Sequence, residues 1–354
     1  MPVALTITTP KVVTVSPPQL NFAYQIGGTI PSPQTLQVSG IGGATFNVHP
    51  ATSSGGNWLS VNPSTGTTPA AISVGVNPLN LPPGSYQGTI SVSGTNGASS
   101  STVVPVGLTV TGQLPTITSL LNAASFLKQA ISPGEVLSIF GAAFGSLTPL
   151  QLQLDSTGKV STSLGNVQVL FSGHPAPLTY VSATQINCVV PYEIVGISNP
   201  SVQVKYSGQT SNAIELTSAL TSPGIFATNG TGQAAILNQD GSVNGPTNPE
   251  TAGNIVSLFM TGEGQTSPPG ITGSVTCQSG CNTLQQIPVP LQAVTAVVGN
   301  RPATVTFYGE APGLVAGVLQ VNLMVPPKTP AGTTPLAISV GATQSQTGVT
   351  LSVR

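Results

Sequence analysis

Proline and glycine interrupt this sequence so often that few stretches could hold an α-helix of three turns. The chain has 41 glycines and 33 prolines in 354 residues, and proline in particular breaks a helix interior. Between these residues, short runs of alternating apolar and polar residues recur about every ten residues, which is typical of β-sandwiches. Clear examples are TLQVSG (35–40), GTISVSG (88–94), NVQVLFSG (166–173) and LAISVGA (336–342). The sequence therefore predicts an all-β protein.

An internal repeat occupies the C-terminal two-thirds of the chain. The segment EVLSIFGAAFG (135–145) matches NIVSLFMTGEG (254–264). Further downstream, residues 167–191 match residues 294–326, with an insertion in the second copy around 265–290. A repeat of this length indicates two copies of one folding unit.

The repeat and the segments outside it set the predicted domain organisation. We expect three tandem immunoglobulin-like β-sandwiches preceded by a strand extension. The predicted parts are an extension at 1–11, a first sandwich at 12–114, and the two repeat copies at 115–221 and 222–354.

Charged side chains are unusually scarce. Lys and Arg number 7 and Asp and Glu number 8, which is 4% of residues and a net charge of −1, against about a quarter in ordinary soluble domains. No charged side chain occurs between Val12 and Leu127. Nucleic acids and anionic membrane surfaces are therefore excluded as partners, because both bind through basic residues. Interfaces with few ions incur little desolvation cost, so the predicted partner is another copy of this chain.

Neither a membrane span nor a leader is evident in the sequence. No stretch reaches the roughly 18 uninterrupted apolar residues of a membrane helix. The first residues, MPVALTITTP, lack the basic and apolar regions of a signal peptide. We expect an extracellular or cell-surface protein whose leader lies outside this numbering or which uses another export route.

The chain offers little for catalysis. His49 and His174 are the only histidines, and neither lies in a recognisable nucleophile motif. The eight acidic residues are scattered over two domains, and nothing in their spacing pairs them as a glycosidase requires. They are Glu135, Asp155, Glu193, Glu215, Asp240, Glu250, Glu263 and Glu310. We predict no enzymatic activity, no cofactor and no metal site.

Two short motifs have structural interpretations. NQDGSVN (238–244) has oxygen-bearing side chains like a calcium loop, but Asp240-Gly241 favours a type I′ hairpin turn. Cys277 and Cys281 are four residues apart and are predicted to form a local disulfide in an oxidising compartment. Cys188 is then expected to be free and buried.

Three residues are candidates for contact with a glycan or for glycosylation. Trp58, the only tryptophan, and Tyr86 are candidates for stacking on a glycan, although a Trp in the alternating WLSV context favours the core. Asn229 begins the sequon Asn-Gly-Thr and is a candidate glycosylation site.

The extension VALTIT (3–8) alternates, so that Val3, Leu5 and Ile7 face one way. Such a segment is a candidate donor strand for the open sheet edge of a neighbouring subunit. The alternatives are the first strand of its own sandwich and a simple linker.

Two stretches resemble known families. The motifs ITSLLNAASF (117–126), PAPLTYVSATQINCVVPYE (175–193) and APGLVAGVLQVNLMVP (311–326) resemble the Solibacter-type C-terminal domain of exported acidobacterial proteins. That resemblance implies immunoglobulin-like units at the cell surface, with no established activity; Cys188 departs from the small residue expected there. NWLSVNPSTGTTPAAISVGVN (57–77) and LPPGSYQGTISVSG (81–94) resemble the Bacteroidetes-associated carbohydrate-binding often-N-terminal (BACON) domain. No functional residue is carried over from either.

These observations favour an extracellular structural protein, the subunit of a surface filament, sheath or layer that assembles with copies of itself. The alternative is a cell-surface adhesin or carbohydrate-binding stalk module. A weaker third interpretation is a non-catalytic fragment of a larger surface enzyme.

Overall fold

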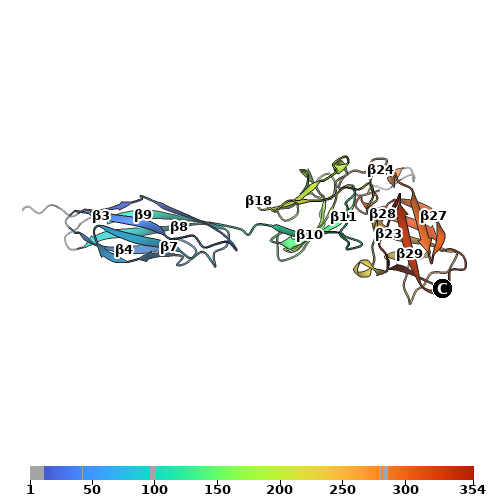
Figure 1. Cartoon of the computed structure of the whole chain (residues 1–354), viewed down its shortest axis with the longest axis horizontal. Coiled ribbons are helices and arrows are strands. Elements are labelled where there is room, and N and C mark those ends of the chain that lie inside the picture. The colour runs from blue at the N-terminus through green and yellow to red at the C-terminus, as the bar shows by residue number, and fades with distance from the viewer. Residues whose placement is uncertain (1–11, 42, 96–100, 279–280, 282–285) are drawn as a thin grey trace, which may run out of the picture. The chain divides into compact units, whose positions relative to one another are not determined.

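The computed structural model describes residues 12–41, 43–95, 101–278, 281 and 286–354 (Figure 1). Strands make up nearly all of its regular structure. Helical structure in this part of the chain is limited to short 3-10 turns such as η1 (Tyr192–Ile194) and η2 (Thr228–Gly230). The all-β prediction is confirmed. The chain divides into two compact units between Gln113 and Leu114.

The N-terminal unit is a sandwich of two sheets. One has the order β1 (Val13–Ser16), β3 (Gln34–Gly40), β7 (Ala70–Val76) and β5 (Leu59–Asn62). The other has the order β2 (Leu20–Gln25), β9 (Ser101–Thr111), β8 (Gly84–Thr95), β4 (Thr45–Thr52) and β6 (Thr65–Thr67), with β2 parallel to β9. Alternate residues of each strand point inward and form one core, which includes Leu36, Phe46, Ile72, Ile90 and Leu108.

The C-terminal unit contains two sandwiches with separate hydrophobic cores. In the first, one sheet has the order β10 (Thr116–Asn122), β11 (Val136–Ala142), β16 (Gln185–Val189), β15 (Leu178–Val181) and β12 (Leu150–Gln151). The facing sheet has the order β14 (His174–Pro175), β13 (Val167–Phe171), β17 (Ser201–Tyr206) and β18 (Gln209–Thr210), and β19 (Ile214–Glu215) also pairs with β17.

The second of these sandwiches is built from one continuous sheet. Its order is β20 (Gly224–Ile225), β23 (Ile255–Thr261), β28 (Val318–Met324), β27 (Arg301–Glu310), β26 (Val294–Val298), β29 (Gly332–Val340), β31 (Val349–Val353) and β21 (Gly232–Gln233). β22 (Ile236–Leu237) pairs with β23, and β30 (Thr343–Gln344) pairs with β29. A separate pair, β24 (Thr266–Ser267) and β25 (Val289–Pro290), lies in the insertion.

The repeat in the sequence corresponds to the same strand pairing in both sandwiches. β11 pairs with β16 in one copy as β23 pairs with β28 in the other. Each copy also has a hairpin with positive φ at both turn residues, Ser172-Gly173 and Gly299-Asn300. The copies differ because β27 is long enough to pair with both β26 and β28, whereas the first copy uses the two short strands β14 and β15.

The turn at Asp240-Gly241 corrects one detail of the sequence interpretation. Positive φ is found at Gly241 and not at Asp240, so the turn is not type I′. The Asp240 carboxylate instead accepts hydrogen bonds from the backbone N–H and hydroxyl of Ser242. The bond from the Ser242 hydroxyl has the larger effect and the bond from its backbone N–H the next largest, and both lower the pKa of the Asp240 carboxyl. Together they close the turn locally.

Candidate functional site

The two C-terminal sandwiches meet where the repeated strands β11 and β23 approach each other (Figure 1). The hydroxyl of Thr261, the last residue of β23, accepts a hydrogen bond from the backbone N–H of Val136 at 2.8 Å. The same hydroxyl donates to the carbonyl oxygen of Gly317 at 2.8 Å. A β-carbon on Gly317 would collide with the carbonyl oxygen of Gly134. The junction is therefore a close backbone contact that only glycine permits at that position.

A buried polar network surrounds Glu135 on one side of this junction. Its carboxylate accepts hydrogen bonds from the Asn122 side chain at 2.9 Å and the Ser132 backbone N–H at 2.9 Å. Asn122 also donates to the carbonyl oxygen of Ser222, at the start of the second sandwich. Glu135 has no exposed surface. Burial raises its pKa to about 8, although these hydrogen bonds and one from Ser222 act in the opposite direction.

A second buried group joins Tyr192 of the first sandwich to Glu263 and Glu310 of the second. The Tyr192 hydroxyl lies 2.7 Å from Oε1 of Glu263 and 3.1 Å from Oε1 of Glu310. The Thr276 hydroxyl donates to Oε2 of Glu310 at 2.6 Å. We call Tyr192, Glu263 and Glu310 the carboxyl–tyrosine cluster. Its members are 5%, 0% and 1% exposed, so solvent does not screen their charges.

The environment of this cluster favours protonated carboxyls. Burial, and next the charge of Glu310, raise the pKa of Glu263 to about 8. Burial likewise raises the pKa of Glu310, against the hydrogen bonds from Thr276 and Tyr192. Burial and the two carboxylates raise the pKa of the Tyr192 phenol, which stays protonated. Oε2 of Glu263 is buried without a hydrogen-bond partner.

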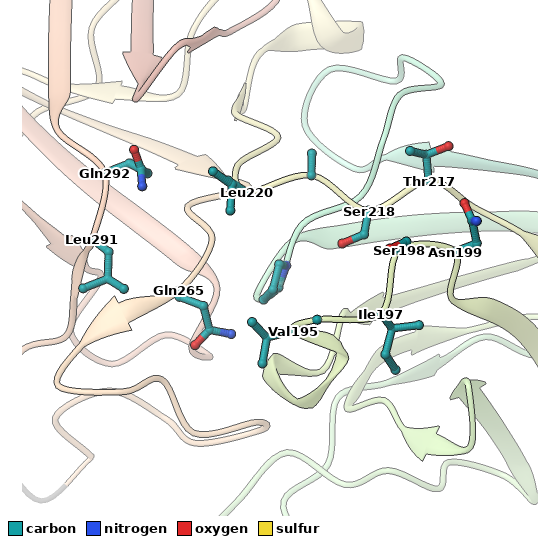
Figure 2. A pocket seen from close by; sticks show the side chains of 13 residues that line it. Val195, Ile197, Ser198, Asn199, Thr217, Ser218, Leu220, Gln265, Leu291 and Gln292 are labelled. Carbon is teal, nitrogen blue, oxygen red and sulfur yellow. The ribbon is translucent and has the colours of Figure 1, made fainter.

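A groove of about 470 Å³ lies beside the cluster, with walls from both C-terminal sandwiches (Figure 2). Val195 and Leu220, which are 60% and 78% exposed, and Leu291 give it an aliphatic surface. Gln265 in the wall donates to the backbone carbonyl of Tyr192 at 3.0 Å, which connects the groove to the cluster. All the side chains that line the groove are uncharged, and none is aromatic.

The sugar-stacking candidates are core residues. Trp58 is 2% exposed, and its indole N–H donates to the Ser54 carbonyl at 2.9 Å. Tyr86 is 9% exposed, and its hydroxyl donates to the Pro82 carbonyl at 2.7 Å. The glycan-contact interpretation of these two residues is wrong, because their rings are packed in the N-terminal core and have no free face.

Cys277 and Cys281 form a disulfide, with Cα atoms 5.0 Å apart. Cys188 is free and buried on β16, and burial raises the pKa of its thiol, which is therefore unreactive. Asn229 lies in the 3-10 turn η2, and its glycosylation stays a prediction. Val3, Leu5 and Ile7 lie outside the described residues, so the donor-strand interpretation also stays a prediction.

The described residues contain no catalytic or metal-binding arrangement that we recognise. His49 is exposed on β4, and His174 follows the tight turn between β13 and β14. No group of three or more His, Cys, Asp or Glu residues in this part of the chain is placed to hold a metal ion. No helix among the described residues is long and apolar enough to cross a membrane.

The carboxyl–tyrosine cluster was not predicted from the sequence, although a signal for it exists. Glu263 and Glu310 are far apart in the chain, and the pairing of β23, β28 and β27 brings them together. In the aligned repeat, Glu263 takes the position of Phe144 in the first copy, a core residue with no exposed surface. An acid where the repeat has a buried aromatic residue indicates a buried carboxyl.

Comparison with known proteins places the chain in the class of tandem β-sandwich proteins with immunoglobulin-like domains. Residues 13–105 match the family model described as the viral BACON domain, and residues 115–218 match the IPT/TIG domain. These matches support a BACON-like sandwich followed by an immunoglobulin-like one, and they do not support the Solibacter-type assignment. No curated protein matches the sequence.

Solved structures resemble the chain only distantly. SGBP-B of the Bacteroides ovatus mixed-linkage glucan utilization locus, solved in complex with a mixed-linkage heptasaccharide, is 11% identical, with 97% of this chain and 70% of that chain covered and a TM-score of 0.28. Mouse cadherin-23 repeats EC22–24 are 10% identical, with 97% and 99% covered and a TM-score of 0.23.

Proposed function

We propose that the chain is a non-catalytic, extracellular structural protein that assembles with copies of itself into a surface filament, sheath or layer. BACON-like and immunoglobulin-like domains are typically binding or structural modules, which favours this class over an enzyme. The Cys277–Cys281 disulfide supports export, because disulfides form and persist in oxidising compartments.

The observation that carries assembly is an open sheet edge without charges. β2 (Leu20–Gln25) is a terminal strand of its sheet and pairs only with β9 among the described residues. Natural proteins usually protect such edges with charged side chains, especially lysine. Here the sequence has no charged side chain from Val12 to Leu127. The Gln34 side chain donates to the backbone carbonyl of Asn21 on this strand at 2.7 Å, and an incoming strand would replace that bond. The edge is therefore suited to accept a strand from another copy.

The proposed donor is the extension at residues 1–11, with Val3, Leu5 and Ile7 on its apolar side. A donor on one copy and an acceptor edge on the next form a heterologous contact, which builds an open polymer from identical chains. The extension itself carries no charge before Lys11, which matches the uncharged edge.

Size-exclusion chromatography and electron microscopy of the purified chain test this proposal. We expect polymers from the full chain and their loss when residues 1–11 are deleted. Ala23→Lys, which puts a charge on an exposed position of β2, should also abolish polymers. Gln37→Lys, at an exposed position of the central strand β3, is the matched control and should not.

The second candidate function is an adhesin or carbohydrate-binding module, which the BACON match favours. It predicts a monodisperse monomer that binds a polysaccharide. That result would overturn the structural proposal. Because Trp58 and Tyr86 are buried, such binding would have to use other residues.

A further inference from the structure

The carboxyl–tyrosine cluster holds two carboxyl groups against a single hydroxyl group. Oε1 of Glu263 and Oε1 of Glu310 both lie within 3.1 Å of the Tyr192 hydroxyl oxygen. A phenol has one proton and donates to one carboxyl oxygen at a time. A favourable contact with the other carboxyl requires that this carboxyl be protonated and donate to the phenol oxygen. Both contacts of the Tyr192 hydroxyl are therefore hydrogen bonds only when one of the two carboxyl groups is protonated.

The surroundings supply nothing that would stabilise two carboxylates. None of the interactions that shift the pKa values of these three groups involves a Lys or Arg of the described chain. From the insertion, Thr276 offers Glu310 a neutral hydroxyl. Glu193, next to Tyr192 on η1, is exposed and accepts a hydrogen bond from Thr272. Oε2 of Glu263 has no partner and no contact with solvent. An unpaired buried charge at this position is strongly unfavourable.

The cluster also holds the two sandwiches together at a point with no space for adjustment. A β-carbon on Gly134 would lie 2.7 Å from the Tyr192 hydroxyl, and one on Gly270 would collide with the same ring. Glu263 lies between Gly262 and Gly264. A β-carbon on Gly262 would collide with the backbone carbonyl of Ser222, and one on Gly264 would collide with the backbone carbonyl of Leu220. Solvation of an ionised Glu263 therefore requires that the sandwiches move apart.

We propose that the carboxyl–tyrosine cluster makes this junction pH-sensitive: the two C-terminal sandwiches stay docked while the cluster is protonated and separate when both carboxyls are ionised. The same movement alters the groove, because its walls come from both sandwiches. Gln265, two residues after Glu263, belongs to the second sandwich, and Val195, directly after η1, belongs to the first. The inference does not depend on polymer assembly, because both sandwiches belong to one chain.

Hydrogen–deuterium exchange of the full chain at pH 6 and pH 9 tests the proposal, after correction for the intrinsic exchange rates. Peptides that cover residues 192–199 and 262–265 should lose protection roughly a hundred-fold at pH 9, because a pKa near 8 in the docked state and an ordinary one in the open state favour opening by that factor. Peptides from residues 12–95 are the internal reference, because they contain no Asp, Glu, Lys or Arg.

The double variant Glu263→Gln with Glu310→Gln should keep clearly more protection than the natural chain at pH 9. The remaining loss is that of Glu135, the other buried carboxyl at this junction, whose pKa burial also raises to about 8. Glu193→Gln should behave like the natural chain. Unchanged protection of the natural chain between pH 6 and pH 9 would overturn the proposal. So would equal loss of protection in the double variant, because other groups would then control the junction. If the double variant does not fold, the carboxyl titration of the natural chain decides: an ordinary pKa for both residues rejects the proposal.

Discussion

Replacement of Glu263 by glutamine should make the protein more stable than the natural chain at alkaline pH. Burial raises the Glu263 pKa from 4.5 to about 8 in the folded state. The folded protein therefore keeps a proton that the unfolded chain releases, and stability falls as the pH rises between these two values. A shift of about 3.5 pH units corresponds to about 5 kcal/mol. Glutamine does not ionise, so the variant avoids this loss.

Urea denaturation at pH 5 and pH 8.5, followed by circular dichroism, measures the effect. At pH 5 the variant and the natural chain should differ by no more than about 1 kcal/mol, because a protonated carboxyl and an amide are both neutral. At pH 8.5 the variant should have the larger free energy of unfolding by up to about 5 kcal/mol. Fluorescence of Trp58, the only tryptophan, reports the N-terminal sandwich separately.

Glu193→Gln is the matched control, because Glu193 belongs to the same junction but is exposed. It should leave the difference between the two pH values unchanged. If Glu263→Gln gains no stability relative to the natural chain between pH 5 and pH 8.5, the Glu263 carboxyl is not buried as we describe and the reasoning fails.

Three further changes test other parts of the structure. Trp58→Ala should destabilise the N-terminal sandwich by about 3–5 kcal/mol, measured by calorimetry, because it empties a filled core position; an unchanged melting temperature would contradict the buried placement. Gly317→Ala should loosen the C-terminal junction and speed proteolysis there, whereas Gly313→Ala, also at positive φ but with no atom near its added methyl group, should have a smaller effect. Replacement of both Cys277 and Cys281 by serine should cost about 2 kcal/mol or less in calorimetry, because the disulfide closes a very short loop; a larger loss would indicate that the bond supports the whole insertion.

The all-β fold was predictable because the alternation of apolar and polar residues along short segments determines which of them form strands. The alternation in GTISVSG (88–94) and LAISVGA (336–342) appears as inward and outward positions of β8 and β29. The turn at Asp240 was misassigned because its side chain closes the turn by hydrogen bonds, which the dipeptide alone does not reveal. Local sequence determines whether a strand forms, but it does not determine which polar groups meet.

The junction was not predictable from spacing, because its members come from distant segments. Tyr192 belongs to the first C-terminal sandwich, whereas in the second Glu263 lies two residues after the end of β23 and Glu310 is the last residue of β27. Only the pairing of β23 with β28 and of β28 with β27 brings the two acids together. The scarcity of lysine and arginine then has a local consequence. No Lys or Arg of the described residues is among the groups that shift the pKa values of these carboxyls, and burial favours their protonated form.

The most direct test of this account is a carboxyl titration of the natural chain by NMR, with the glutamate side chains labelled with carbon-13. The chain has six glutamates, and Glu263→Gln and Glu310→Gln assign the two of interest. The account predicts that the Glu263 carboxyl titrates with a pKa of about 8 and that the Glu310 pKa is raised with it. A Glu263 resonance that titrates near its ordinary pKa of 4.5, with the junction still docked, would contradict the account.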